Sequence, residues 1–136
     1  MKFSIPVYYF SACFWLLLLS NCNQIPAGKL YGKWKYIQVE NLNINDTDSV
    51  TAGELKIQDP LIEFTKSNKL IIYWGGKILS HGTFKMENRM IRFTEELENG
   101  KTREFPFLIK DISESVLVFE TMSASSTRVR AVKVSD

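Results

Sequence analysis

The sequence predicts an all-β domain of eight short antiparallel strands behind an apolar N-terminal segment. Two observations carry this prediction. Apolar, β-branched and aromatic residues recur in short runs after Gly32, as strands prefer. Gly, Asn and Ser residues that favour turns separate these runs, and no long stretch has a convincing helical period. This spacing is typical of a barrel or a sandwich, and a chain of 136 residues allows one domain.

The N-terminal segment has the order of a secretory signal peptide. Lys2 precedes an apolar run, Phe3 to Leu19, that is short for a membrane span of ~20 residues. The stretch Leu19-Ser20-Asn21-Cys22 then resembles the lipobox of bacterial lipoproteins, in which the cysteine is lipidated and becomes the new N-terminus. An uncleaved anchor followed by a linker is the alternative, and both place the domain outside the cytoplasm.

These features divide the chain into three parts. We expect a lipoprotein signal peptide over residues 1–21, a tether over 22–30 and the β-domain over 31–135. Cys22 would carry acyl chains such as palmitate, and Cys13 would leave with the signal peptide. The mature domain would then have no free thiol, disulfide or cysteine-based metal site, so its stability must come from a packed core.

The first strand is predicted over about Lys33–Glu40. Trp34 and Tyr36 share one face of it, whereas Ile37 and Val39 share the other, which indicates a bulge or a strand covered on both sides. A long polar connection, Asn41–Asp59, follows. Connections of this length are often lids or binding loops, and Glu54–Ile57 is a candidate for a short element within it.

The later strands follow at short, regular intervals. Ser67-Asn68, Gly75-Gly76, Glu87-Asn88, Ser113-Glu114 and Ser123-Ala124-Ser125 are the turn signals. The predicted strands are Leu61–Thr65, Leu70–Trp74, Ile78–Met86, Met90–Leu97, about Thr102–Lys110, Val116–Thr121 and Thr127–Val134.

The connection at Glu98-Asn99-Gly100 permits a prediction of register. A two-residue loop would put Phe105 on the opposite face from Phe93, since one residue of slip moves every side chain to the other face. A three-residue loop with Gly100 left-handed pairs Leu97 with Lys101 instead. The hydrophobic pattern selects this loop, with Phe93 opposite Phe105, Ile91 opposite Phe107 and Glu95 opposite Arg103.

Several stretches together resemble lipocalin-like domains of small bacterial lipoproteins. They are Gly32-Lys33-Trp34, the long first connection, Gly82-Thr83-Phe84, residues 107–119 and a last strand that bears arginines. The resemblance implies an eight-stranded up-and-down antiparallel barrel with an apolar cavity, which agrees with the eight predicted strands. It also implies a plug at one end, in which Arg128 or Arg130 packs over Trp34. An ordinary core tryptophan with two surface arginines is the alternative.

In such a barrel the first strand starts at one end, here called the closed end, and the long connection lies at the other, the mouth. Inward-pointing aromatic residues could line an apolar pocket or simply fill the barrel. The candidates on the face that includes Gly82 are Tyr73, Phe84, Phe93, Phe105 and Phe107. Near the mouth on that face, Glu95 and Arg103 could orient a polar ligand head or form an ion pair at a wet rim.

The orientation of Tyr73 has a consequence for the outer surface. If Ile71 and Tyr73 face inward, Leu70, Ile72, Trp74 and Leu79 face outward. That arrangement would form an apolar patch for a partner unless the long connection covers it.

The sequence favours binding over catalysis. His81 is the single histidine, no cluster has metal-ligand spacing, and we expect no enzymatic activity and no bound metal or cofactor. With 17 basic and 15 acidic residues and no basic run, nucleic acid is not an expected partner. We expect a lipoprotein anchored in the outer membrane, facing the periplasm, that binds a small apolar or amphipathic molecule. The alternative is a side-chain-filled barrel that binds another envelope protein.

Overall fold

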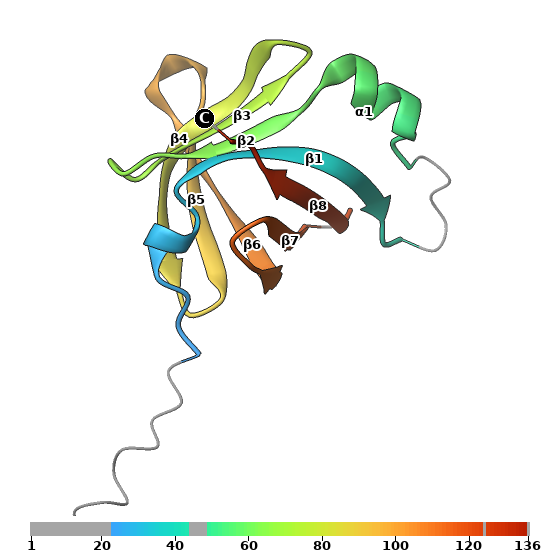
Figure 1. Ribbon diagram of the computed structural model, residues 1–136. Helices are drawn as coiled ribbons and strands as arrows, with labels where there is room; N and C mark the ends of the chain where they lie inside the picture. The colour runs from blue at the N-terminus through green and yellow to red at the C-terminus, as the bar shows by residue number, and fades with distance from the viewer. Residues whose placement is uncertain (1–22, 44–48, 124, 136) are drawn as a thin grey trace, which may run out of the picture.

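The computed structural model describes residues 23–43, 49–123 and 125–135, which form an all-β domain. Eight strands make a closed antiparallel barrel in which each strand pairs with its neighbours in the chain and β8 returns to β1 (Figure 1). The fold class is therefore as predicted. The strands are β1 (Gly32–Asn41), β2 (Leu61–Phe64), β3 (Lys69–Trp74), β4 (Lys77–Glu87), β5 (Met90–Glu96), β6 (Thr102–Ile112), β7 (Val116–Thr121) and β8 (Thr127–Lys133).

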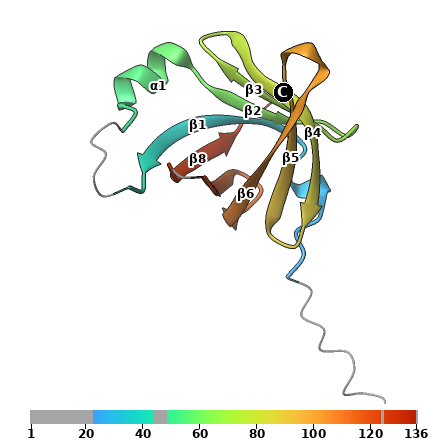
Figure 2. The same ribbon diagram turned by 180° about the vertical axis from the view of Figure 1, so that it is seen from behind.

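The predicted signal peptide and the lipidation site at Cys22 lie outside the described residues. Within the described residues, no helix is both long and apolar enough to cross a membrane. The described chain begins at the closed end, where the Ile25 amide donates to the Asn88 carbonyl in the β4–β5 turn at 3.1 Å. The 3₁₀ helix η2 (Ala27–Lys29) then leads into β1. Figures 1 and 2 show this N-terminal segment and helix α1 at opposite ends of the barrel.

A bulge at Ile37 reverses the faces of β1, which is the first of the two alternatives that its sequence indicated. The pairing of β1 with β8 shifts register between Tyr36 and Gln38. Trp34 and Tyr36 are consequently buried before the bulge, and Val39 faces the interior after it, while Ile37 is exposed. The bulge thus lets one strand supply inward side chains along its whole length.

The long connection contains helix α1 (Ala52–Gln58), which includes the predicted short element. Thr51 and Glu54 form a capping box: the Thr51 hydroxyl accepts from the Glu54 amide, and the Glu54 carboxylate accepts from the Thr51 amide. Leu55 is buried in the core, and the Gly75 amide donates to the Gln58 carbonyl at 2.7 Å. These contacts fix the helix beside the β3–β4 turn at the mouth.

The β5–β6 hairpin has the predicted three-residue loop. The Leu97 amide donates to the Lys101 carbonyl at 2.7 Å, around η3 (Glu98–Gly100). Phe93 lies opposite Phe105, Ile91 opposite Phe107 and Glu95 opposite Arg103, so this predicted register is confirmed. Gly100 is left-handed as predicted, with φ of 73°, and Asn99 is left-handed as well.

The β3–β4 hairpin contradicts the predicted orientation of Tyr73. Its ladder pairs Tyr73 with Ile78 but Ile72 with Ser80, which leaves Leu79 as a bulge residue. The bulge pairs Gly82 with Leu70. The regular register after a two-residue turn would instead have put Gly82 opposite Lys69, on the face of Tyr73. Leu70, Ile72 and Trp74 therefore face the interior, and the predicted outer patch built on them does not form.

The closed end is filled by side chains from all eight strands and from the segment before β1. Its core, here called the floor cluster, consists of Leu30, Trp34, Ile62, Phe64, Leu70, Phe84, Ile91, Ile109, Leu117 and Ala131, all buried. Within it, Phe64 and Phe84 meet edge to face at 5.1 Å, and the Trp34 indole N–H donates to the Leu30 carbonyl at 2.8 Å. Gly82 permits a close approach of β4 to β5, since a Cβ there would lie 1.9 Å from the Thr94 carbonyl oxygen.

Candidate ligand-binding site

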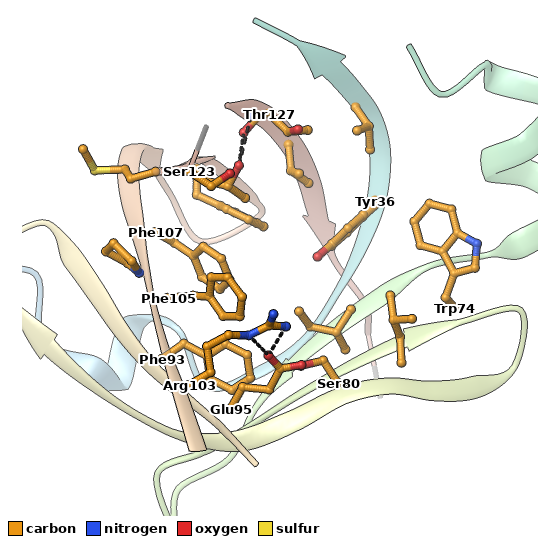
Figure 3. A pocket seen from close by; sticks show the side chains of 18 residues that line it. Tyr36, Trp74, Ser80, Phe93, Glu95, Arg103, Phe105, Phe107, Ser123 and Thr127 are labelled. Atoms are coloured by element: carbon orange, nitrogen blue, oxygen red, sulfur yellow. Dashed lines mark hydrogen bonds and ion pairs between the residues drawn. The ribbon is translucent and has the colours of Figure 1, made fainter. Parts of the chain in front are cut away.

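The mouth half of the barrel holds an open cavity of about 560 Å³ (Figure 3). Its lining comes from every strand except β2 and includes a large aromatic part. The aromatic residues that line it are Tyr36, Trp74, Phe93, Phe105, Phe107 and Phe119. Ring centroids lie 5.9 Å apart for Phe93 and Phe107, and 5.4 Å apart for Phe107 and Phe119. The wall is thus a continuous apolar surface suited to an apolar ligand.

One wall of the cavity carries a polar network centred on Glu95. The Arg103 guanidinium donates to Glu95 Oε2 from Nη2 at 2.8 Å and from Nε at 3.1 Å. The Ser80 hydroxyl donates to the other oxygen, Oε1, at 2.8 Å. Glu95 is only 9% exposed, and a carboxylate at that depth needs such partners because burial removes its hydration. Ser80 shares the face of Gly82 on β4, and Gly82 pairs with Glu95, so the alternation of the strand places the Ser80 hydroxyl beside this carboxylate.

Arg103 also closes over the aromatic wall. Its Cζ lies 4.3 Å from the centroid of the Phe105 ring, a cation–π distance. The side chain is half exposed, so it reaches from the wall toward solvent at the mouth. The predicted pair of Glu95 and Arg103 therefore exists, with one partner buried in the wall and the other at the rim.

Tyr36 lies across the cavity from this network, one inward position above Trp34 on β1. Its ring packs edge to face against Phe119 at 6.1 Å. The side chain is buried, and the hydroxyl points into the cavity (Figure 3). Burial raises the pKa of this hydroxyl far above its ordinary value, so it keeps its proton at neutral pH.

The cavity contains five of the seven predicted lining residues, namely Phe93, Glu95, Arg103, Phe105 and Phe107. The other two lie elsewhere. Phe84 faces inward but belongs to the floor cluster, and Tyr73 is on the outer face, where its hydroxyl donates to Glu63 at 3.0 Å. Burial, together with the bond and charge of Glu63, raises the pKa of Tyr73.

The prediction that Arg128 or Arg130 packs over Trp34 is wrong, because neither arginine lies near this ring. β8 starts at the mouth, so Arg128 lies far from Trp34 and pairs with Glu120 at 2.7 Å and Glu40 at 3.7 Å. Arg130 is exposed, opposite Gln38. Lys133 takes the predicted place: its Nζ lies 4.7 Å from the centroid of the Trp34 ring and donates to the Tyr31 carbonyl.

Sequence reasoning missed the other lining residues of the cavity, among them Tyr36, Trp74, Ser80 and Phe119. Tyr36 was assigned to the face of Trp34 without a role, although that alternation already pointed to it. Ser80 had a signal too, because it alternates with Gly82 along β4. Trp74 had none, because the bulge at Leu79 decides its orientation.

Other chemistry has little support among the described residues. His81 is exposed and lies 3.4 Å from Glu96, measured from Nδ1 to Oε2. In the part of the chain that the structure describes, no group of three or more His, Cys, Asp or Glu side chains could hold a metal ion.

Comparison with known proteins adds no relative. No protein-family model matches the chain, and no curated protein sequence matches it.

Proposed function

We propose that this chain is a lipocalin-like lipoprotein of the bacterial envelope that binds one small apolar or amphipathic molecule at the mouth of its barrel. The observation that carries the proposal is the cavity of about 560 Å³, left open above a filled floor cluster. Small-molecule sites commonly have volumes of about 300–1,000 Å³, apolar walls and a few fixed polar groups. The aromatic wall and the network around Glu95 match that description.

The proposed location rests on the N-terminal segment. Leu19-Ser20-Asn21-Cys22 resembles a lipobox, and a lipid on Cys22 would tether the barrel to a membrane. Asn23 is not the aspartate associated with retention in the inner membrane, which favours the outer membrane. No acidic run follows Cys22, which favours the periplasmic face.

Native mass spectrometry of the protein purified from its own envelope tests the binding proposal. We expect a population heavier than the protein by the mass of one small molecule, which organic extraction removes. A uniform mass equal to that of the protein with its N-terminal modification would contradict the proposal.

A matched pair of variants on β1 shows whether that molecule occupies the cavity. Val39 lines the cavity, whereas Ile37, two residues away, is 46% exposed on the outside. We expect Val39→Trp to fill the cavity and to lose the bound molecule. Ile37→Trp should keep it, since the added ring lies in solvent.

A second function is favoured by exposed apolar side chains beside the mouth. Ile57 on α1 is 80% exposed, and Ile78 and Leu79 on β4 are 57% and 64% exposed. These residues fit the alternative of a module that binds another envelope protein. An Ile57→Glu, Ile78→Glu double variant should then lose a cross-linked partner in the envelope. Cross-linking equal to wild type would exclude these residues as its contact surface.

A further inference from the structure

The hydroxyl of Tyr36 is a hydrogen-bonding group inside the cavity with no protein partner among the described residues. The side chain is 7% exposed and its ring packs against the Phe119 ring. Its hydroxyl makes no hydrogen bond to a described residue. No polar side-chain atom of the described residues is fully buried and unpaired, so this hydroxyl is open to the cavity space rather than sealed in the wall. Figure 3 shows it directed toward the centre of the pocket.

An empty cavity lets water satisfy such a hydroxyl, but a ligand that fills the cavity displaces that water. A purely apolar ligand would then leave the phenol without a hydrogen bond, and a buried polar group without a partner is costly. A ligand that offers an acceptor atom at this position avoids the cost. The cavity therefore discriminates between ligands of equal apolar size.

The opposite wall limits what kind of polar group is accepted. Both carboxylate oxygens of Glu95 already accept hydrogen bonds, from Ser80 and from Arg103. Nη1 of Arg103, in contrast, donates to no described residue. Arg103 offers only donors, whereas the Tyr36 hydroxyl can donate or accept. An acceptor on the ligand is therefore the one kind of polar group that both residues can bond.

We infer that the ligand is an amphipathic molecule with an oxygen acceptor, such as a carboxylate or a hydroxyl, that lies inside the cavity and accepts a hydrogen bond from Tyr36. This inference rests on the proposed function and specifies the class of molecule. The acceptor lies inside the barrel because Tyr36 is the inward residue next above Trp34 of the floor cluster. The apolar part of the ligand packs on the rings of Phe93, Phe107 and Phe119.

Three probes with the same ten-carbon chain test the acceptor: decanoate, decanol and decylamine. The first two carry an acceptor oxygen, whereas the ammonium of decylamine has only donors at neutral pH. Binding is measured by titration calorimetry on the purified full chain after extraction of bound lipid. We expect wild type to bind decanoate and decanol more tightly than decylamine.

Two Tyr→Phe variants remove the same group, a phenol hydroxyl, from the inside and from the outside of the barrel. Tyr36→Phe removes the hydroxyl in the cavity, and Tyr73→Phe removes one on the outer face that is bonded to Glu63. We expect Tyr36→Phe to weaken decanol about 3- to 10-fold, the value of one neutral hydrogen bond, and decanoate about 10-fold or more, because a bond to a carboxylate is charge-assisted. Decylamine should lose less than either, since its ammonium cannot accept from the phenol. Tyr73→Phe should leave the affinity for all three probes unchanged.

The denaturation midpoint shows whether the variant remains intact. Since the Tyr36 hydroxyl has no described partner, Tyr36→Phe should unfold at the wild-type urea concentration. A lower midpoint would reveal a protein partner and overturn the inference. Equal affinity of wild type and Tyr36→Phe for decanol would also overturn the inference, but it would leave the proposed function intact. Failure of wild type to bind any probe would count against the proposed function itself.

Discussion

At the closed end of the barrel, Trp34, Phe64 and Leu70 fill the interior completely, whereas at the mouth Phe93, Phe107 and Phe119 leave a cavity of about 560 Å³. All eight strands contribute to the floor cluster, and all but β2 line the cavity. A barrel of eight strands can either be filled or hold one small ligand. Side chains therefore determine which region is filled and which is hollow. The closed end is filled partly because Leu30, from the segment before β1, adds to the floor cluster.

The two regions also differ in how their polar groups are satisfied. The Trp34 indole of the floor cluster has a fixed acceptor, the Leu30 carbonyl. At the mouth, the Tyr36 hydroxyl has no described partner, and Glu95 needs two donors to remain buried. The closed end is thus complete without a ligand, while the mouth has unused bonding capacity. This contrast predicts that stability is concentrated at one end and selectivity at the other.

Two tryptophans provide the strongest test of this contrast. Trp34→Ala should lower the free energy of unfolding by about 3–5 kcal/mol, because it leaves a cavity in the floor cluster. Trp74→Ala should cost less than half as much, since Trp74 is only partly buried at the mouth. Urea denaturation followed by circular dichroism measures both. Equal losses would break the contrast, and so would a Trp34→Ala variant that keeps full stability but loses ligand binding.

Removal of the Arg103 side chain should have the next largest effect. Arg103→Met leaves the Glu95 carboxylate with Ser80 as its remaining donor, at a cost of about 1–3 kcal/mol for a mostly buried acceptor. The control is Arg92→Met, which removes an exposed pair with Glu87 and should cost less than about 1 kcal/mol. Thermal and urea unfolding of the two variants should differ. If they do not, the network at the mouth adds no stability beyond that of a surface ion pair.

The buried phenol predicts a dependence of stability on alkaline pH. Because the pKa of Tyr36 is raised on folding, its contribution is present below the unfolded value of about 10 and is lost as the pH rises above it. The decline should approach about 1.4 kcal/mol per pH unit for one group. Urea midpoints between pH 8 and 11 should therefore fall less steeply in Tyr36→Phe than in wild type. Tyr73→Phe should have a smaller influence, and identical slopes for all three proteins would contradict the burial of Tyr36.

The smallest effect is expected for Lys133, whose ammonium group lies over the Trp34 ring of the floor cluster. Lys133→Met removes the cation over Trp34 and the bond to Tyr31, but it keeps the apolar stem in place. We expect a loss of about 0.5–1 kcal/mol and unchanged ligand affinity. Arg130→Met, on the exposed side of β8, is the control and should change neither quantity. A loss of affinity in Lys133→Met would show that the two ends are coupled.

The two hairpins show how much of this fold could be predicted from the sequence. In β5–β6 the aromatic residues of both strands have to share one face, so the hydrophobic pattern selects the loop and fixes the register. In β3–β4 every position from Leu70 to Trp74 is apolar, so the pattern cannot distinguish the two faces. The bulge at Leu79 sets the orientation of β3 relative to β4, and an uninterrupted apolar run gives no sign of its position.

The cation over Trp34 could have been identified with more consistent reasoning. The predicted meander already placed the start of the last strand at the mouth, so Arg128 could not reach the closed end. Lys133, at the end of that strand, satisfies the same topology. The resemblance to lipocalin-like domains suggested a cation on the last strand. Its position along that strand follows from the direction in which the strand runs.

The bond between Ile25 and Asn88 has a consequence for how a ligand would travel. It pins the N-terminal segment to the closed end, so a lipid on Cys22 would have three residues of chain, at most about 11 Å, before the barrel begins. A ten-residue strand tilted by about 40° rises roughly 25 Å, which is more than this tether can span. The mouth would therefore open into the aqueous phase, away from the bilayer. A molecule dissolved in that membrane would have to desorb into water before capture, so the rate of loading would follow its free concentration in the surrounding fluid.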